Sequence, residues 1–466
     1  MGTVLVLGVA AGAAVIVARS SQGDHTDLFD AATGAGGSAT TTGDSSQVAT
    51  TPTSRPPTVT DPLPPDGSVA FMVGQDSSTL GLLRLEAPSL PEPYGVVLNV
   101  GLAPPASMLA GVPPAGTVGL PSSAATLDVA AGITDVATTL ADYPDSALVL
   151  GLSLADGTCS NDVALALVGQ PTTGAQASTQ GDLFSAIDRM SAYFAGLAPR
   201  AVYLKIGYEF EGGWNCYFPS LYVQAYRVVA ERVAAIAPDV QFVWQAAAHP
   251  RADFAPPSDH VEGEIPLATL RDYRFNGQAD PAAGFPATDP GFGQGVLNAW
   301  YPGDDVVDWV GFSYVGGSNF SAQWGPVVTS YSPRDQQQAV LAFAREHAKP
   351  VMIGQASPLG YDLAQSSFGD IFASAPPQPL STDSIWLDWF SELFVFVSAN
   401  SDVIRAVTYV NTPWQSMPQW RCTGEAGSET CPGSYYGDSR IQANPALLEK
   451  LVAQLDADGW ATAPPP

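Results

Sequence analysis

Eight short apolar segments recur along this chain of 466 residues, and they constrain its fold more than any other feature. Several are almost continuously hydrophobic, which is typical of strands that are buried on both faces of a parallel sheet. Amphipathic stretches with the apolar spacing of helices separate many of them. The expected strands span residues 69–74, 94–101, 147–154, 201–210, 240–247, 306–315, 350–355 and 404–411.

This number of alternating strands and helices predicts a (β/α)8 TIM barrel. The clearest helices are expected at 220–237 and after Ser332, which would cap the helix that Pro333 begins. A doubly wound open sheet is the alternative. That fold usually has a glycine-rich phosphate-binding turn after its first strand, and the sequence has none. Further helices are expected near 126–141, 181–196, 383–398 and 444–455.

The N-terminal region differs sharply from the rest of the chain. Residues 2–18 are uncharged and almost wholly apolar, which predicts either a signal peptide or a membrane anchor within 1–19. Both alternatives imply export, so we expect a secreted or membrane-anchored protein. Residues 20–66 are rich in Ser, Thr, Gly and Pro and predict a disordered stalk, because so few apolar residues cannot offset the entropy lost on folding. The barrel with its loop insertions is therefore expected at 67–458.

Acidic side chains dominate the charged residues: 45 Asp and Glu stand against 18 Lys and Arg, for a formal net charge of −27. A nucleic-acid partner would require a basic surface, so the composition argues against one. The nucleotide-binding pattern GxxxxGK[ST] and the serine-hydrolase pattern GxSxG are both missing from the sequence. We expect a monomer that needs no cofactor.

The four cysteines are expected to form structural disulfides, because an even number in an exported chain is typical of such bridges. Cys422 and Cys431 enclose a short loop and most simply pair with each other, which leaves Cys159 for Cys216. A metal site is the less favourable alternative, since no CxxC pattern occurs and the four histidines lack the spacing of metal ligands.

Polar and aromatic side chains cluster where the predicted strands end, and in a TIM barrel the carboxyl ends of the strands carry the functional residues. Aromatic rings can stack on the apolar faces of sugars, while amides and carboxylates bind sugar hydroxyls. This combination predicts a carbohydrate-binding site, although core packing is the competing interpretation for Trp244. The expected substrate-binding residues are Gln75, Asp76, Tyr208, Glu211, Trp214, Trp244, Trp300 and Trp414.

Four longer motifs make the prediction more specific: VYLKIGYEFEGGWNCY, WYPGDDVVDWVGFSYV, KPVMIGQASPLGY and YGDSRIQANP. Together they resemble exported TIM-barrel glycoside hydrolases and are similar to family 26, the β-mannanase family, over about residues 66–455. The resemblance implies hydrolysis of a polysaccharide with Glu209 as the general acid/base. It also implies that Tyr314 supports the nucleophile, whose position in this chain is Gln355.

Gln355 departs from that family, because a retaining glycosidase has a carboxylate there and a neutral amide cannot form the covalent glycosyl intermediate. Four interpretations follow. Another carboxylate acts in an inverting mechanism, or the substrate supplies its own nucleophile, as an N-acetyl group does in some glycosidases. Alternatively, the barrel has lost catalysis and binds glycan, or glutamine replaces a glutamate of the natural protein. The other candidate carboxylates are Asp76, Glu211 and Asp362.

The expected function is thus hydrolysis of a polysaccharide, either a β-mannan-like polymer or another cell-wall glycan. A catalytically silent barrel that binds glycan is the alternative.

Overall fold

A computed structural model describes most of the chain from residue 63 onward. Residues 1–62, which include the predicted membrane segment and most of the predicted stalk, lie outside the described residues. All four cysteines also lie outside them, so the expected disulfides stay predictions. The described residues are 63–65, 67–102, 120, 127–129, 132–155, 161–170, 172, 179–212, 215, 217–248, 294–315, 333–369, 376–417, 435–457 and 459–463.

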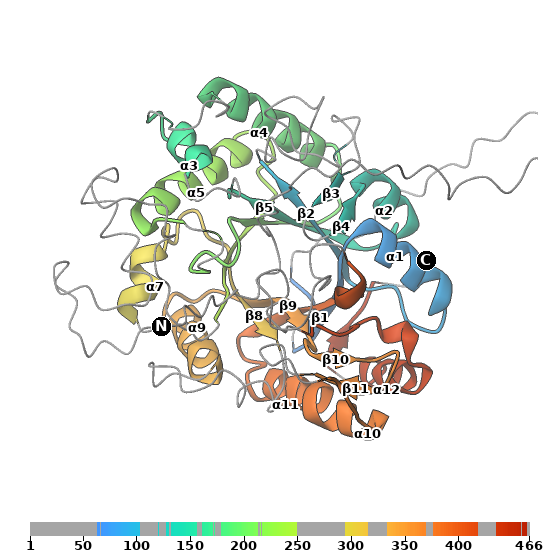
Figure 1. Cartoon of the computed structure of the whole chain (residues 1–466). Coiled ribbons are helices and arrows are strands. Elements are labelled where there is room, and N and C mark those ends of the chain that lie inside the picture. Colours follow the sequence, from blue (N-terminus) through green and yellow to red (C-terminus); the bar gives the residue numbers. More distant parts are fainter. Residues whose placement is uncertain are drawn as a thin grey trace, which may run out of the picture.

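Eight parallel strands form a closed barrel, which confirms the predicted (β/α)8 fold (Figure 1). Each barrel strand pairs with the next, and the last closes the ring on the first through the pairs from Ala70–Ala406 to Gly74–Val410. All eight predicted strands are confirmed. They are β1 (Val69–Gln75), β2 (Gly95–Gly101), β5 (Ala147–Ser153), β6 (Val202–Ile206), β7 (Gln241–Ala246), β8 (Trp309–Val315), β9 (Val351–Ser357) and β13 (Ile404–Val410).

Helices surround the barrel (Figure 1). The structure confirms the helices predicted at 181–196, 220–237 and 444–455 and the one predicted after Ser332. A short strand, β14 (Trp460–Ala461), pairs with the start of β1 just beyond the predicted end of the domain. The helices are α1 (Ser77–Glu86), α2 (Val136–Asp142), α3 (Asp162–Leu167), α4 (Gln180–Ala195), α5 (Pro219–Ala234), α7 (Gln294–Trp300), α9 (Pro333–Glu346), α10 (Thr382–Ile385), α11 (Glu392–Ala399) and α12 (Pro445–Leu455).

The prediction of a helix near 126–141 is wrong for the first half of that range of residues. Strands β3 (Leu127–Val129) and β4 (Gly132–Thr134) form an antiparallel hairpin there, and Gly132 adopts φ 110°, a conformation that L-residues rarely reach. Helix α2 begins only after Asp135, whose carboxylate accepts a hydrogen bond from the Thr138 N–H at 3.0 Å and so caps the helix.

The helix predicted at 383–398 is present, but it is not uniform. It runs from α10 through a π-helical segment, Trp386–Ser391, into α11. Helices α1, α3 and α7 were not predicted. Two of them have only six and seven residues, too short for the apolar periodicity of a helix to emerge.

The barrel strands divide the apolar residues into two cores, because successive side chains of a strand point to opposite faces of the sheet. The larger core lies between the barrel and the helices. The smaller core occupies the first half of the barrel strands and includes Met72, Tyr203 and Trp309. Further along the strands, the positions with the same inward orientation are polar and buried. They are Asn99, Lys205, Gln245, Ser313, Gln355 and Thr408.

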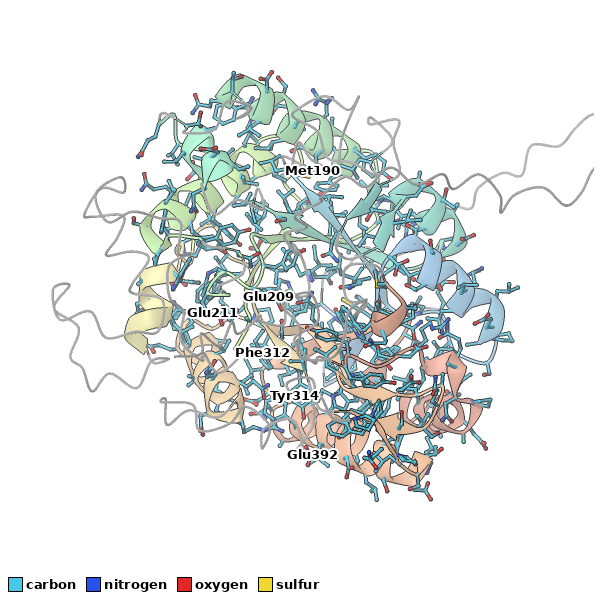
Figure 2. The ribbon with its side chains drawn as sticks, in the orientation of Figure 1. Met190, Glu209, Glu211, Phe312, Tyr314 and Glu392 are labelled. Carbon is cyan, nitrogen blue, oxygen red and sulfur yellow. The ribbon has the colours of Figure 1, made fainter. Side chains whose placement is uncertain are left out.

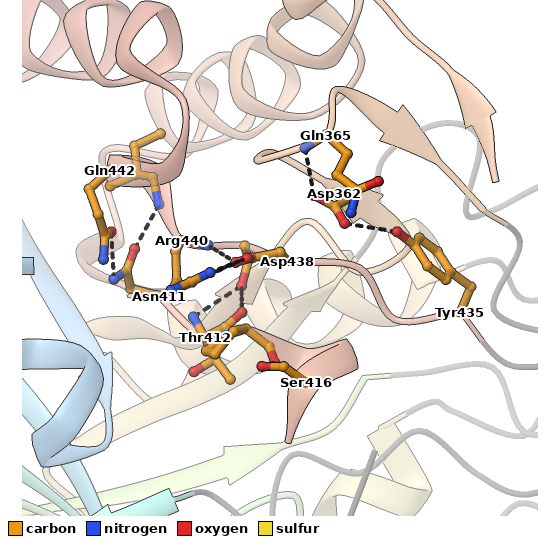
Figure 3. A network of polar contacts seen from close by, with 12 residues as sticks. Asp362, Gln365, Asn411, Thr412, Ser416, Tyr435, Asp438, Arg440 and Gln442 are labelled. Carbon is orange, nitrogen blue, oxygen red and sulfur yellow. Dashed lines mark hydrogen bonds and ion pairs between the residues drawn. The ribbon is translucent and has the colours of Figure 1, made fainter. Parts of the chain in front are cut away.

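The segments that follow β9 and β13 are joined by polar side chains (Figure 3). Asp438 forms a 2.6 Å ion pair with Arg440 and also accepts a hydrogen bond from the Arg440 backbone N–H at 3.0 Å. Asp362 accepts hydrogen bonds from the Tyr435 hydroxyl and from the Gln365 backbone N–H, both at 2.8 Å. We call these five residues the C-terminal network.

Candidate active site

Glu209 stands on a sharp turn that follows β6. Both Gly207 and Glu209 have positive φ angles, 53° and 55°, and for a residue with a side chain this conformation costs about 1–3 kcal/mol. The Asn215 side-chain amide stabilises the turn by donating to the backbone oxygens of Tyr208 and Glu209 at 3.1 and 2.9 Å. The fold therefore holds Glu209 in a strained conformation at the carboxyl end of the barrel.

Ser313 connects Glu209 with Gln355. Its hydroxyl donates to the Glu209 Oε1 at 2.7 Å and lies 3.1 Å from the Gln355 Oε1. The two oxygens are therefore no more than about 6 Å apart, comparable with the separation of about 5–5.5 Å between the carboxyl groups of retaining glycosidases. Glu209 and Gln355, which lie 146 positions apart in the sequence, thus meet in one hydrogen-bonded cluster.

Gln245 completes what we call the central cluster: Glu209, Gln245, Ser313 and Gln355. The Gln245 side-chain amide donates to the Ser313 hydroxyl at 3.0 Å and to the Gln355 Oε1 at 3.2 Å. This arrangement requires glycine at position 354, because a Cβ there would lie 2.2 Å from the Gln245 Oε1. All four side chains are buried, and Glu209 and Gln355 are 1% and 2% exposed.

Lys205 lies below the central cluster and is fully buried in the barrel interior. Its ammonium donates to the Gly354 backbone oxygen at 3.2 Å and lies 5.2 Å from the centre of the Tyr208 ring. Burial lowers the pKa of Lys205 to about 8, although the Glu209 carboxylate acts in the opposite direction. Burial, and then the charge of Glu209, raises the pKa of Tyr208. The site therefore combines one carboxylate with one easily deprotonated lysine.

Several polar atoms near the carboxyl ends of the strands are buried without a hydrogen-bond partner. They include both amide atoms of Gln75, the Asn99 Oδ1, the Gln245 Oε1 and the Thr408 hydroxyl. Such atoms are uncommon, because more than about 90% of buried polar groups in proteins are paired. Sugar hydroxyls and amides are ligands that would satisfy them.

Two of the predicted site carboxylates have structural contacts. Glu211 accepts hydrogen bonds from the backbone N–H groups of Ala247 and Ala248 at 2.7 and 2.6 Å. Asp76 caps α1 by accepting from the backbone N–H of Thr79 at 2.9 Å and from its hydroxyl. Each carboxylate thereby fixes the backbone that follows a barrel strand.

Tyr314 does not join the central cluster, contrary to the role that the resemblance implies. Because Ser313 points inward, its neighbour Tyr314 points outward, and its ring centre lies 6.2 Å from that of Trp389 and 5.7 Å from that of Phe396. Its hydroxyl accepts a hydrogen bond from Arg334 at 3.1 Å. Figure 2 shows Tyr314 displaced from Glu209 towards α11. Ser313, the neighbour of Tyr314 on β8, is the residue whose hydroxyl lies beside Gln355.

Two predicted sugar-stacking residues, Trp244 and Trp300, lie in the larger core between barrel and helices. Both are fully buried, and the Trp244 indole N–H donates to the Trp300 backbone oxygen at 3.1 Å. The Trp244 ring also stacks on Phe210 at 4.4 Å. The structure therefore supports the core-packing interpretation of Trp244 and extends it to Trp300.

Trp414 lies at the carboxyl end of the barrel, where its indole N–H donates to the Ser357 hydroxyl at 3.0 Å. It is 2% exposed. Trp214 lies outside the described residues, so its predicted contact with sugar stays a prediction.

The residues that the sequence analysis did not assign to the site are Ser313, Lys205 and Asn99, whereas Gln245 is among the polar residues that it expects at the strand ends. The sequence contains one sign of such residues: along one face of a strand, which consists of every second residue, the side chains change from apolar to polar, as from Val243 to Gln245. Within the described ranges, no three His, Cys, Asp or Glu side chains are placed to hold a metal ion. No helix in that part of the chain has the length and apolar character needed to cross a membrane.

The fold and the central cluster together define a (β/α)8 barrel whose carboxyl end holds a buried carboxylate beside an amide. No family model matches the sequence. The chain is 27% identical over 344 residues to a β-1,3-xylanase of an Alcaligenes species, covering 73% of this chain and 57% of that protein. It is also 27% identical over 398 residues to a β-1,3-xylanase of a Vibrio species, covering 83% and 65%. The chain therefore spans less than two thirds of either relative.

Solved structures with a similar fold include a family 26 β-mannanase of Bacteroides ovatus, with a TM-score of 0.46 and 11% identity over 85% of this chain and 91% of that one. A modular endo-β-1,4-mannanase of Cellulomonas fimi has a TM-score of 0.44 and 13% identity over 85% and 72%. The chain thus resembles glycoside hydrolases, as its motifs predicted.

Proposed function

We propose that this chain hydrolyses glycosidic bonds in a β-linked polysaccharide, with Glu209 as the general acid/base. The observation that supports this most directly is the position of Ser313, whose hydroxyl lies 2.7 Å from the Glu209 carboxylate and 3.1 Å from the Gln355 amide oxygen. The two sequence relatives make β-1,3-xylan the first polymer to test. β-Mannan, which the sequence motifs suggest, is the second.

In this proposal water bonds to the anomeric carbon as the bond to the leaving glycosidic oxygen breaks, that oxygen takes the proton of Glu209, and the Glu209 carboxylate then takes up the proton that the water loses. The Ser313 hydroxyl orients the carboxylate, and the deep burial of both groups strengthens their electrostatic interaction. The unpaired amide atoms of Gln75 and the unpaired Oδ1 of Asn99 bind hydroxyls of the sugar. The apolar segment 2–18 supports export, which would bring such an enzyme to a polymer outside the cell.

A second candidate is a barrel that binds glycan without cleaving it. Gln355 favours this alternative, because its neutral amide takes the position of the nucleophile in the family that the motifs resemble. The unpaired buried amides would serve binding in the same way in both cases.

The experiment is an assay of the full chain for new reducing ends with β-1,3-xylan, β-mannan, β-1,4-xylan, β-glucan and polymers of 2-acetamido sugars. Glu209→Gln is expected to lower turnover at least about 1,000-fold, because the amide cannot transfer the proton. Glu231→Gln is the matched control: Glu231 is exposed on α5 and pairs only with Arg227 in the described structure, so turnover should not change. Binding to a polymer without turnover on any of them would favour the second candidate.

A further inference from the structure

We propose that the Ser313 hydroxyl changes its hydrogen-bond acceptor each time Glu209 gains or loses its proton, and that Gln355 is the acceptor while Glu209 is protonated. Gln355 is then a positioning residue that acts on Glu209 through Ser313. This role rests on the proposed function and deepens it, because it lets one carboxylate serve first as an acid and then as a base. Three features of the central cluster support it.

The first feature is that the single hydrogen of the Ser313 hydroxyl has two acceptors within reach. Its oxygen lies 2.7 Å from the Glu209 Oε1 and 3.1 Å from the Gln355 Oε1. A hydroxyl has one hydrogen to donate and two lone pairs with which to accept. Ser313 therefore donates to one of these oxygens at a time. The negative charge and the shorter distance favour Glu209 as long as its carboxylate is ionised.

The second feature is the Gln245 amide, which occupies the other side of the hydroxyl with a donor. Its nitrogen donates to the Ser313 Oγ at 3.0 Å and to the Gln355 Oε1 at 3.2 Å. The amide turned over would bring its own oxygen against the Gln355 oxygen, so this orientation is the favourable one. Because the nitrogen takes one lone pair of the Ser313 oxygen, the hydrogen of Ser313 points towards Glu209 or Gln355.

The third feature is that the same atomic positions suit both protonation states of Glu209. The ionised carboxylate accepts from Ser313. A protonated Glu209 has lost its charge, and its O–H can donate to the second lone pair of the Ser313 oxygen. The hydrogen of Ser313 then turns to the Gln355 Oε1, whose two lone pairs accept from both Ser313 and Gln245. Ser313 keeps its hydrogen throughout, and no side chain has to move.

An amide at position 355 suits this exchange better than a carboxylate. A charged acceptor there would compete with Glu209 for the hydrogen of Ser313, because hydrogen bonds to charged groups are about twice as strong as neutral ones. A neutral amide loses the hydrogen when Glu209 is ionised and regains it when Glu209 is protonated. Both side chains are deeply buried, so water does not replace either hydrogen bond.

The titratable groups beside Glu209 belong to its own strand and turn. Lys205 on β6 and Tyr208 on the turn that follows interact electrostatically with Glu209. The members of the central cluster on β7, β8 and β9 are uncharged amide and hydroxyl side chains. Substitutions at positions 313 and 355 leave Lys205 and Tyr208 in place, so a comparison between variants isolates the effect of the hydrogen bonds.

The test follows the Glu209 carboxyl by carbon-13 NMR of the full chain labelled at the glutamate Cδ, with Glu209→Gln to assign its signal. Gln355→Met removes the acceptor that the protonated state needs, so the midpoint of the Glu209 titration should fall by about 0.5–1 pH unit. Ser313→Ala removes the donor to the ionised carboxylate, so the midpoint should rise by about 1 pH unit. Gln224→Met on the exposed face of α5 is the matched control and should leave the midpoint unchanged.

A double substitution shows whether Gln355 acts through Ser313. In the Ser313→Ala background, Gln355→Met should leave the midpoint unchanged, because the hydroxyl that connects Gln355 with Glu209 is gone. Equal shifts with and without Ser313 would overturn the inference, since Gln355 would then act on Glu209 by another contact. Circular dichroism shows whether each variant is folded, and Gln355→Leu replaces Gln355→Met if the latter unfolds.

The outcomes are distinguishable from those for the proposed function. Midpoints that stay unchanged or move in the same direction in the two single variants would overturn the inference, even if a polysaccharide is hydrolysed. A Glu209 carboxyl that keeps one protonation state between about pH 4 and pH 10 would do the same. Opposite shifts without turnover of any polymer would refute the proposed function and leave the exchange of acceptors standing. With turnover, the pH profile of kcat/KM should shift with the Glu209 midpoint in each variant.

Discussion

The central cluster and the C-terminal network are both built from buried polar side chains, but their carboxylates are held differently. Asp438 and Asp362 in the network receive hydrogen bonds from a guanidinium, a phenol and backbone N–H groups. The donor to Glu209 within the cluster is the Ser313 hydroxyl, which can rotate, and the Gln245 amide beside it has an unpaired oxygen. Fixed, charge-assisted donors favour a structural role, whereas rotatable and unpaired groups leave room for a ligand.

The largest expected effect that distinguishes the two regions is on stability. Asp438→Asn should lower the free energy of unfolding by about 2–3 kcal/mol, because the charged hydrogen bonds with Arg440 are lost in a partly buried setting. Turnover per folded molecule should not change. Urea denaturation gives the first quantity, and the assay of the folded fraction gives the second. A loss of turnover at full stability would place the network in the active site.

A smaller effect should separate two adjacent residues, Ser313 and Tyr314. Ser313→Ala removes the hydrogen bond to Glu209 and should lower kcat about 10–100-fold, in line with about 1.5–3 kcal/mol for a hydrogen bond to a charged group. Tyr314→Phe removes only the contact with Arg334 and should leave kcat within about twofold, at a stability cost near 1 kcal/mol. Steady-state kinetics of both variants would decide between them, and the reverse order of effects would contradict the assignment of Ser313.

Ser313 and Tyr314 also show which features of the site could be predicted from the sequence and which could not. The barrel was predictable because its strands are continuous apolar runs, and Glu209 and Gln355 were predictable because each lies where a strand ends. The motif at 306–315 identifies the correct strand but not which of its faces points inward. The orientation of the strand is set by Trp309, which packs in the barrel interior against side chains of other strands.

Aromatic and acidic residues were harder to assign for a related reason. Trp244 is buried between barrel and helices, yet its place in the sequence near a strand end equally suits a sugar platform. Glu211 was expected to bind substrate, but its partners are the backbone N–H groups of Ala247 and Ala248. Backbone donors that lie 36 and 37 residues away have no signature in the sequence.

The smallest predicted effect concerns the cations beside Glu209 and Asp438: the fully buried Lys205 and the partly buried Arg440. The hydrogen bond that Arg440 donates to Asp438 raises the pKa of Arg440, so this side chain stays charged, whereas burial lowers the pKa of Lys205 to about 8. Between about pH 8 and 10 the unfolded chain therefore binds more protons at Lys205 than the folded chain does, and stability at this residue rises with pH. The groups that act on Lys205 are the Glu209 carboxylate and the neutral Tyr208 ring.

The Lys205 contribution should increase the free energy of unfolding by about 1 kcal/mol between pH 8 and pH 9. Urea denaturation at the two pH values should show this increase in the natural chain and not in Lys205→Met, so the difference between the two proteins isolates Lys205 from other titrating groups. Arg440→Met should leave the pH dependence as it is, since Arg440 does not titrate in this range. An identical pH dependence in Lys205→Met would mean that Lys205 keeps its proton up to pH 9, and that the central cluster holds its charges as firmly as the C-terminal network does.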